Sequence, residues 1–121
     1  MKYLCLIYHD EQAWSKRPKS ELETVMSEYF AFTEDIKQGD VWRAGEALHP
    51  TGAATTVRVR NRSTTTTDGP FAEAREQLGG FYLIESKDLN EAIQVASRIP
   101  AARWGAVEVR PVVDFSASQA G

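Results

Sequence analysis

Two short stretches of the chain are apolar without interruption, and they limit the possible folds more than any other feature. Tyr3–Tyr8 reads Tyr-Leu-Cys-Leu-Ile-Tyr, and Phe81–Ile84 reads Phe-Tyr-Leu-Ile. Their shortness and their aromatic and β-branched side chains favour strands. A strand that is apolar on both sides needs cover on both faces of its sheet. The chain has 121 residues, which is the length of one domain with a modest core.

Two helices are predicted from apolar residues at three- and four-residue steps. The first begins at Ser20, which forms an S-x-x-E capping box with Glu23, and stops near Gly39. Its apolar stripe comprises Leu22, Val25, Met26, Tyr29, Thr33 and Ile36. The second begins at Asp88 as N-cap and ends at Pro100. Its stripe comprises Leu89, Ala92, Ile93, Ala96 and Ile99.

The remaining strands are shorter or half-polar. Val41–Leu48 reads as one strand, and Val107, Val109 and Val113 alternate with charged residues to give the last one. Thr55–Asn61 and Thr64–Thr67 flank a turn and predict a hairpin.

The order of these elements is β-α-β, an inserted β-hairpin, then β-α-β. It predicts an α+β fold of the ferredoxin-like split βαβ type, with one domain over residues 1–115 and a polar tail over residues 116–121. Two helices cover only one face of such a sheet. Because the central strands are apolar on both faces, we expect a homodimer that packs sheet against sheet.

Composition excludes several classes of function. The formal net charge is −3, so direct binding to nucleic acid is unexpected. No apolar run approaches the roughly 20 residues that span a bilayer, so we expect no membrane association. No signal-peptide cleavage site follows the first strand, which favours the cytoplasm.

Sequence motifs narrow the chemistry further. The chain has 2 His, His9 and His49, and 1 Cys, Cys5; their spacing matches no recognised metal site, and we expect neither a metal nor a cofactor. No G-x-S-x-G, P-loop or G-x-G-x-x-G motif is present, which disfavours elbow-type serine hydrolases and common nucleotide-binding domains.

Residues 68–80 carry the densest functional signal. Because the first and third main strands of a split βαβ sheet are antiparallel neighbours, this segment should enter its strand beside Tyr8 and His9. Carboxylates near an imidazole are suited to general acid–base chemistry. The candidate catalytic residues are Asp68, His9, Glu73 and Glu76. A turn with a solvated acidic segment explains the same residues equally well.

Several neighbouring residues are candidates for binding a small-molecule ligand. Trp14 lies between the first strand and the first helix, where it forms either a pocket wall or an ordinary loop contact. Glycines let a backbone approach a ligand closely. The candidate ligand-binding residues are Tyr8, Trp14, Gly69, Phe71, Gly79 and Gly80.

The string Asp68-Gly69-Pro70-Phe71, followed by Glu76-Gln77-Leu78-Gly79-Gly80-Phe81-Tyr82, resembles the DGPF subgroup of the YCII-related family. The likeness continues in Met1–Leu4, Gly45–Leu48, Thr55–Arg60, Ile99–Arg103 and Val107–Pro111. It implies a ferredoxin-like dimeric α/β barrel. The family has no generally established reaction, although a His–Asp pair in a cleft has led to the idea of an enzyme. Members of the subgroup also occur fused to, or encoded beside, sigma-70-like factors of the extracytoplasmic-function class.

The chain departs from this family pattern at one position. The histidine that relatives carry in the first helix is missing, and Tyr29 and Phe30 occupy that region. Asp68 matches the acidic half of the pair, and His9 is our candidate to replace the histidine. Two functions stay open: a small-molecule enzyme or binding protein, and a non-catalytic regulatory module that pairs with a sigma-70-like factor.

Overall fold

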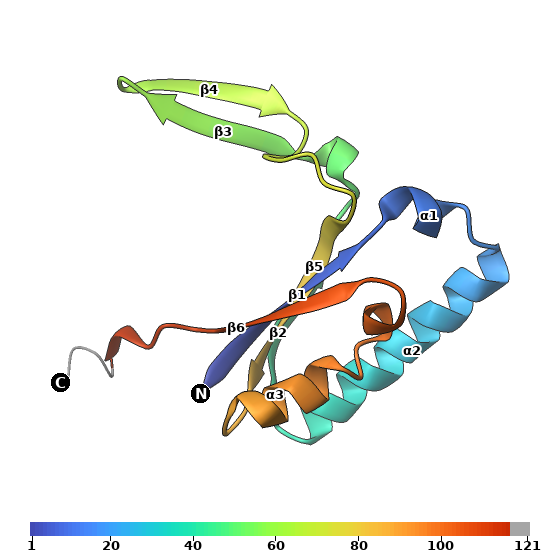
Figure 1. The fold of residues 1–121 in the computed structure, drawn as a ribbon. Helices are drawn as coiled ribbons and strands as arrows, with labels where there is room; N and C mark the ends of the chain where they lie inside the picture. Colours follow the sequence, from blue (N-terminus) through green and yellow to red (C-terminus); the bar gives the residue numbers. More distant parts are fainter. Residues whose placement is uncertain (117–121) are drawn as a thin grey trace.

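A computed structural model describes residues 1–116, which form a mixed α+β fold around a four-stranded antiparallel sheet (Figure 1). The strand order is β2-β5-β1-β6. The strands are β1 (Lys2–His9), β2 (Trp42–Ala47), β5 (Gln77–Glu85) and β6 (Ala106–Pro111). This arrangement is compatible with the predicted ferredoxin-like fold. The predicted tail, residues 116–121, lies outside the described residues except for its first member.

The two central strands, β1 and β5, are antiparallel as predicted. Ile7 is paired with Gly80, and His9 with Gln77. The start of β5 therefore lies beside the end of β1. The last strand is shorter than predicted, because β6 ends at Pro111 and Val113 is 66% exposed.

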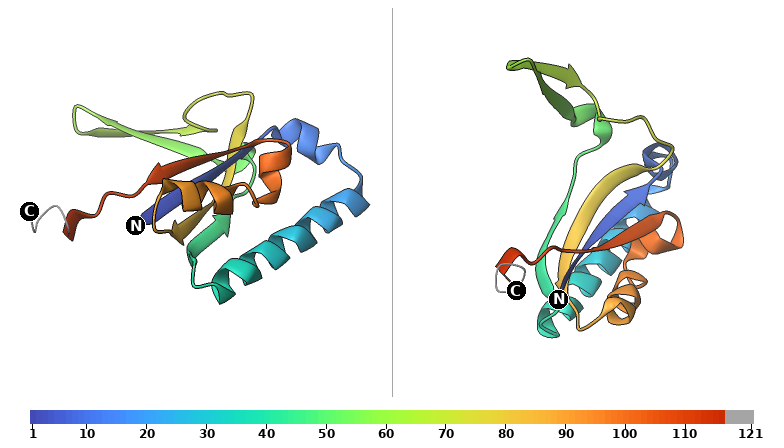
Figure 2. Two further views of the ribbon diagram at one scale, coloured as in Figure 1. Left: turned by 60° about the horizontal axis from the view of Figure 1, so that its bottom comes forward. Right: turned by 60° about the vertical axis from the view of Figure 1, so that its left-hand side comes forward.

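The two longer helices, α2 (Lys19–Gln38) and α3 (Leu89–Ala96), lie on the same face of the sheet (Figure 2). The predicted capping box of α2 is wrong. Pro18 is the N-cap and makes no side-chain capping bond, so Ser20 already lies in the first turn. The predicted stop at Gly39 is confirmed, because its N–H donates to the Asp35 carbonyl at 3.0 Å.

Helix α3 begins as predicted, but it is shorter than predicted and buries a different set of side chains. The Asp88 carboxylate accepts the N–H of Glu91. The helix ends at Ala96, and Pro100 instead begins the short 3₁₀ helix η2 (Pro100–Arg103). Leu89 and Ile93, both members of the predicted apolar stripe, are 49% and 48% exposed. The buried side chains of α3 are Ala92, Val95 and Ala96; the alanines let the helix approach the sheet closely.

Strands β3 (Thr55–Arg60) and β4 (Ser63–Asp68) pair with each other in a separate two-stranded sheet. Their two-residue turn places Asn61 and Arg62 at φ of 51° and 64°, as the twist of a tight hairpin requires. The hairpin projects away from the main sheet (Figures 1 and 2). It follows the 3₁₀ helix η1 (Thr51–Ala53).

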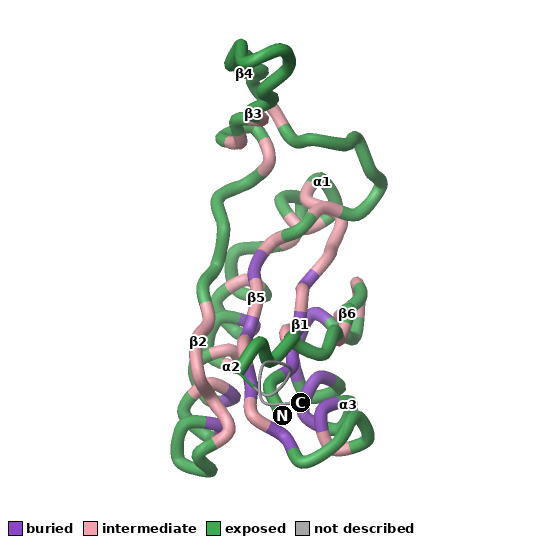
Figure 3. The backbone as a smooth tube through the Cα atoms, turned by 90° about the vertical axis from the view of Figure 1, so that its left-hand side faces the viewer, coloured by how far each residue is buried: buried purple, intermediate pink, exposed green. Residues whose placement is uncertain are grey.

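Buried and half-buried residues alternate along the central strands of the main sheet (Figure 3). Tyr3, Cys5 and Ile7 of β1 are buried under the helices, together with Tyr82 and Ile84 of β5. The alternate residues of these strands point to the other face and are only half-buried; these are Leu4, Leu6, Tyr8, Phe81 and Leu83. Within residues 1–116, both longer helices lie on the first face, so the second is left without a helical layer (Figure 2).

Candidate functional site

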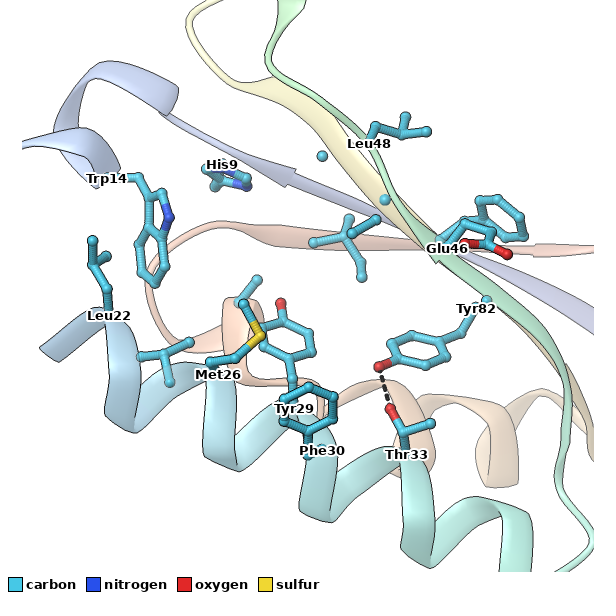
Figure 4. A pocket seen from close by; sticks show the side chains of 18 of the residues that line it. His9, Trp14, Leu22, Met26, Tyr29, Phe30, Thr33, Glu46, Leu48 and Tyr82 are labelled. Carbon is cyan, nitrogen blue, oxygen red and sulfur yellow. Dashed lines mark hydrogen bonds between the residues drawn. The ribbon is translucent and has the colours of Figure 1, made fainter. Parts of the chain in front are cut away.

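A cavity of about 700 Å³ lies between α2 and the sheet (Figure 4). The first part of α2 points its apolar stripe toward this space. Its contributions are Leu22, Val25, Met26, Tyr29, Phe30 and Thr33. The sheet supplies Ile7, His9, Gly79 and Tyr82 to the opposite wall. The predicted stripe of α2 therefore contributes both to the core and to the cavity wall. Ile36 is a core residue and is 2% exposed, whereas Met26 lines the cavity and is 56% exposed.

His9 lies at one end of this cavity, at the last position of β1. A Cβ added to Gly79 would lie 2.5 Å from Cε1 of His9, so the imidazole packs directly on the glycine backbone. The ring also meets the edge of Trp14, with 6.0 Å between ring centroids. Gly79 is thus a position where a side chain would displace the histidine.

Trp14 is held in place by a second aromatic ring. It stacks on Trp104 with 5.3 Å between centroids. The Arg17 guanidinium carbon lies 5.2 Å from the Trp14 ring and 5.0 Å from the Trp104 ring. This cation–π arrangement fixes an aromatic wall beside His9. Trp14 belongs to the short helix α1 (Glu11–Ser15), which the sequence pattern does not predict.

Hydrogen bonds from Glu11 anchor α1 over the cavity. Its carboxylate accepts the Thr51 N–H and hydroxyl, both at 2.8 Å. Its own N–H donates to the Gln77 side chain at 2.9 Å. The Asp10 carboxylate caps the helix by accepting the N–H groups of Gln12 and Ala13. The entrance to the hairpin and the start of β5 are therefore both tied to the element that carries Trp14.

Hydroxyl groups line the part of the cavity farther from His9. Tyr82 and Thr33 share a hydrogen bond of 2.6 Å between their oxygens, and burial raises the pKa of Tyr82. Burial is also the main cause that raises the pKa of Tyr29 to about 12, against a smaller effect of the Ala101 backbone N–H. Both phenols therefore stay protonated at neutral pH and can donate hydrogen bonds.

The structure brings together four of the predicted site residues. His9, Trp14, Gly79 and Gly80 all line the cavity. Tyr8 lies on the opposite face of β1, where its hydroxyl donates to the Glu108 carboxylate at 3.4 Å.

The other predicted residues lie on the hairpin and the segment that follows it. Asp68 is the last residue of β4, and Glu73 and Glu76 are exposed. Gly69 has a φ of 103°, a conformation that favours glycine. Phe71 is 75% exposed, and the Arg58 guanidinium carbon lies 5.2 Å from its ring. In the described part of the chain, none of these five residues lines the cavity.

Comparison with known proteins assigns the chain to a family. A family model described as the YCII-related domain matches residues 1–116. The chain belongs to the YCII-related family. This YCII-related protein is 42% identical over 118 residues to an uncharacterized protein of Rhizobium meliloti (strain 1021). The aligned region covers 93% of this chain and 92% of the relative.

Sequence reasoning on this YCII-related protein missed the hydroxyl-bearing part of the cavity. Thr33 stood in the predicted apolar stripe of α2, where a hydroxyl was the available signal. Tyr29, a member of the same predicted stripe, lines the cavity. Tyr82 gave no signal, because its ring looks like any core residue of an apolar strand.

Two further findings bear on the possible chemistry of the family member. Within residues 1–116, no group of three or more His, Cys, Asp or Glu side chains is placed to hold a metal ion. None of the helices in that range is both long enough and apolar enough to cross a bilayer.

Proposed function

We propose that this protein binds a small molecule in the cavity between α2 and the sheet, and that His9 acts on it as an acid or base. The cavity of about 700 Å³, with an imidazole at one end, is the observation that carries the proposal. Cavities of this size and apolar character are typical of small-molecule sites. Histidine is the side chain best suited to proton transfer near neutral pH.

The test compares the two histidines. A library of small organic compounds is screened for thermal stabilisation of the protein, and the stabilising compounds are then followed by NMR for chemical conversion. We expect His9→Ala to fold and to lose conversion. The matched variant His49→Ala should behave like the wild type, because His49 is exposed and outside the cavity lining. Equal conversion by His9→Ala and the wild type would refute the role of His9.

The carboxylates Asp68, Glu73 and Glu76 belong to the same test. Asp68 is the candidate that the family resemblance supplies, and Asp68→Asn is assayed beside His9→Ala. If both variants lose conversion, the segment after β4 takes part in the reaction. If only His9→Ala loses it, the imidazole works without this carboxylate.

We also propose that two copies pack through the open face of the sheet to form the dimeric α/β barrel of the family resemblance, and that the chain belongs to its DGPF subgroup. Leu6 and Phe81 are paired neighbours on that face, and both are half-buried in a single chain. An apolar sheet face of this kind favours a protein partner. A second copy is the simplest partner, because it brings the same complementary face.

The regulatory alternative predicts a complex with a sigma-70-like factor. A module of that kind has no need of a cavity lined by His9 and two phenols, and we therefore favour the small-molecule function. Affinity purification from the native host separates the two hypotheses. Recovery of a sigma-70-like factor, together with a screen in which no compound stabilises the protein, would support the regulatory one.

A further inference from the structure

The cavity holds hydroxyl protons for which residues 1–116 supply no acceptor. Tyr82 and Thr33 have one proton each, and the single bond between their oxygens uses one of them. One O–H is therefore left to donate. The Ala101 backbone N–H interacts with the Tyr29 oxygen, and no acceptor for the Tyr29 proton is found among residues 1–116. A molecule that enters the cavity meets donors, and it needs an acceptor to match them.

Several aromatic rings contribute to the walls of the cavity. Trp14, Trp42 and Trp104 line it together with the two phenols, and Met26 adds a thioether. Ring faces and thioethers pack well against flat apolar molecules. Figure 4 shows Trp14 of α1, Met26 and Tyr29 of α2, and Tyr82 of the sheet reaching into one space.

Charge around the cavity disfavours an anion. Three carboxylates, Glu11, Glu34 and Glu46, line it, against a single lysine, Lys37, among the described residues. The Lys37 ammonium lies 4.6 Å from the Trp42 ring centroid and is exposed. An acid or phosphate placed inside would lose part of its hydration and would face more carboxylates than lysines in the described lining, which makes burial of its charge costly.

We propose that the cavity takes an uncharged, flat and largely apolar molecule with a carbonyl or similar acceptor oxygen, which Tyr29 or the Tyr82–Thr33 pair binds. This inference rests on the proposed small-molecule function and names its ligand class. It excludes carboxylic acids and phosphate esters as preferred ligands.

Three probes with one ring skeleton test the ligand class: 2-acetylnaphthalene, naphthalene and 2-naphthoate. Each is titrated against the protein with bound Nile red, and the loss of dye fluorescence gives a relative affinity. We expect the ketone to bind about fivefold more tightly than naphthalene, as one hydrogen bond allows. We expect 2-naphthoate to bind at least about tenfold more weakly than the ketone, because its charge would be buried beside a lining in which carboxylates outnumber lysines.

Variants assign the donor. Either Tyr29→Phe, or Tyr82→Phe combined with Thr33→Val, should remove the advantage of 2-acetylnaphthalene over naphthalene and leave naphthalene binding unchanged. Tyr3→Phe is the matched control, since Tyr3 is buried but outside the cavity lining. Equal binding of ketone and naphthalene to the wild type, or tighter binding of 2-naphthoate, would overturn the ligand class and leave the proposed function standing. Failure of Nile red and all three probes to bind would overturn both.

Discussion

The imidazole of His9 rests on the backbone of Gly79, across the pair of central strands. No side chain fits between them, because a Cβ at Gly79 would lie 2.5 Å from Cε1 and 3.0 Å from Nδ1 of the ring. The glycine therefore sets the position of the histidine in the cavity. Sequence reasoning had assigned Gly79 a close approach to a ligand, whereas the close approach observed is to His9.

Gly79→Ala should displace the His9 ring without unfolding the protein, because the clash is with a movable side chain. We expect a loss of about 1–3 kcal/mol in the free energy of unfolding, measured by urea titration. The NMR signal of His9 Hε1 should shift as the ring leaves Trp14. Gly52→Ala is the control, since nothing lies within 4 Å of a Cβ at that position. An unchanged Hε1 signal in Gly79→Ala would contradict the packing described.

Alkaline pH should destabilise the protein through buried acids. Burial raises the pKa of the Cys5 thiol from 9.0 to about 11 and that of Tyr29 from 10.0 to about 12. A group whose pKa is raised on folding contributes its full stability below the unfolded pKa. That contribution is lost as the pH rises toward the folded pKa. Stability to urea should therefore be level from pH 7 to 8 and fall between pH 9 and 11.

Cys5→Ala isolates the contribution of the thiol. The variant lowers stability at every pH because it removes buried volume, but its decline between pH 9 and 11 should be shallower than that of the wild type. Parallel pH profiles for the two proteins would show that the thiol has no part in the alkaline loss.

The proposed dimer can be broken by one charge on the open face of the sheet. Leu6 pairs with Phe81 on β5 and Glu108 on β6, so Leu6→Glu places a second carboxylate in the centre of that face. We expect the wild type to sediment as a dimer at micromolar concentration and Leu6→Glu to sediment as a monomer. Ile93→Glu on α3, where Ile93 is 48% exposed, is the matched control and should stay dimeric. A monomeric wild type would remove the dimer proposal.

Much of the fold could be predicted, because burial leaves a periodic trace in the sequence. The unbroken apolar runs located β1 and β5, and the antiparallel pairing of those strands placed Gln77 beside His9. The position of the three acidic candidates could not be predicted in this way. The route of residues 69–76 between the hairpin and β5 depends on turn conformations, such as the φ of 103° at Gly69, which strand periodicity does not encode.

The cavity could not be predicted from the same periodicity. A stripe such as Leu22, Val25 and Met26 looks identical whether the helix touches the sheet or stands away from it. The distance between α2 and the sheet depends on the side chains of both elements. Among them are the rings of Phe32 and Tyr82, which meet edge to face with 5.2 Å between centroids. Only the three-dimensional structure shows that the first part of α2 leaves an open space.

The N-termini of α2 and α3 offer a last test. The sequence predicts a capping side chain for each helix, and the structure shows such a cap only for α3 among the two. The Asp88 carboxylate accepts the Glu91 N–H at 2.9 Å, so Asp88→Ala should lower the free energy of unfolding by about 1 kcal/mol. Ser20 lies inside α2, where alanine is the better helix former. Ser20→Ala should therefore leave stability unchanged or slightly higher in the same urea titration. An equal loss in both variants would mean that α2 begins at Ser20 in solution.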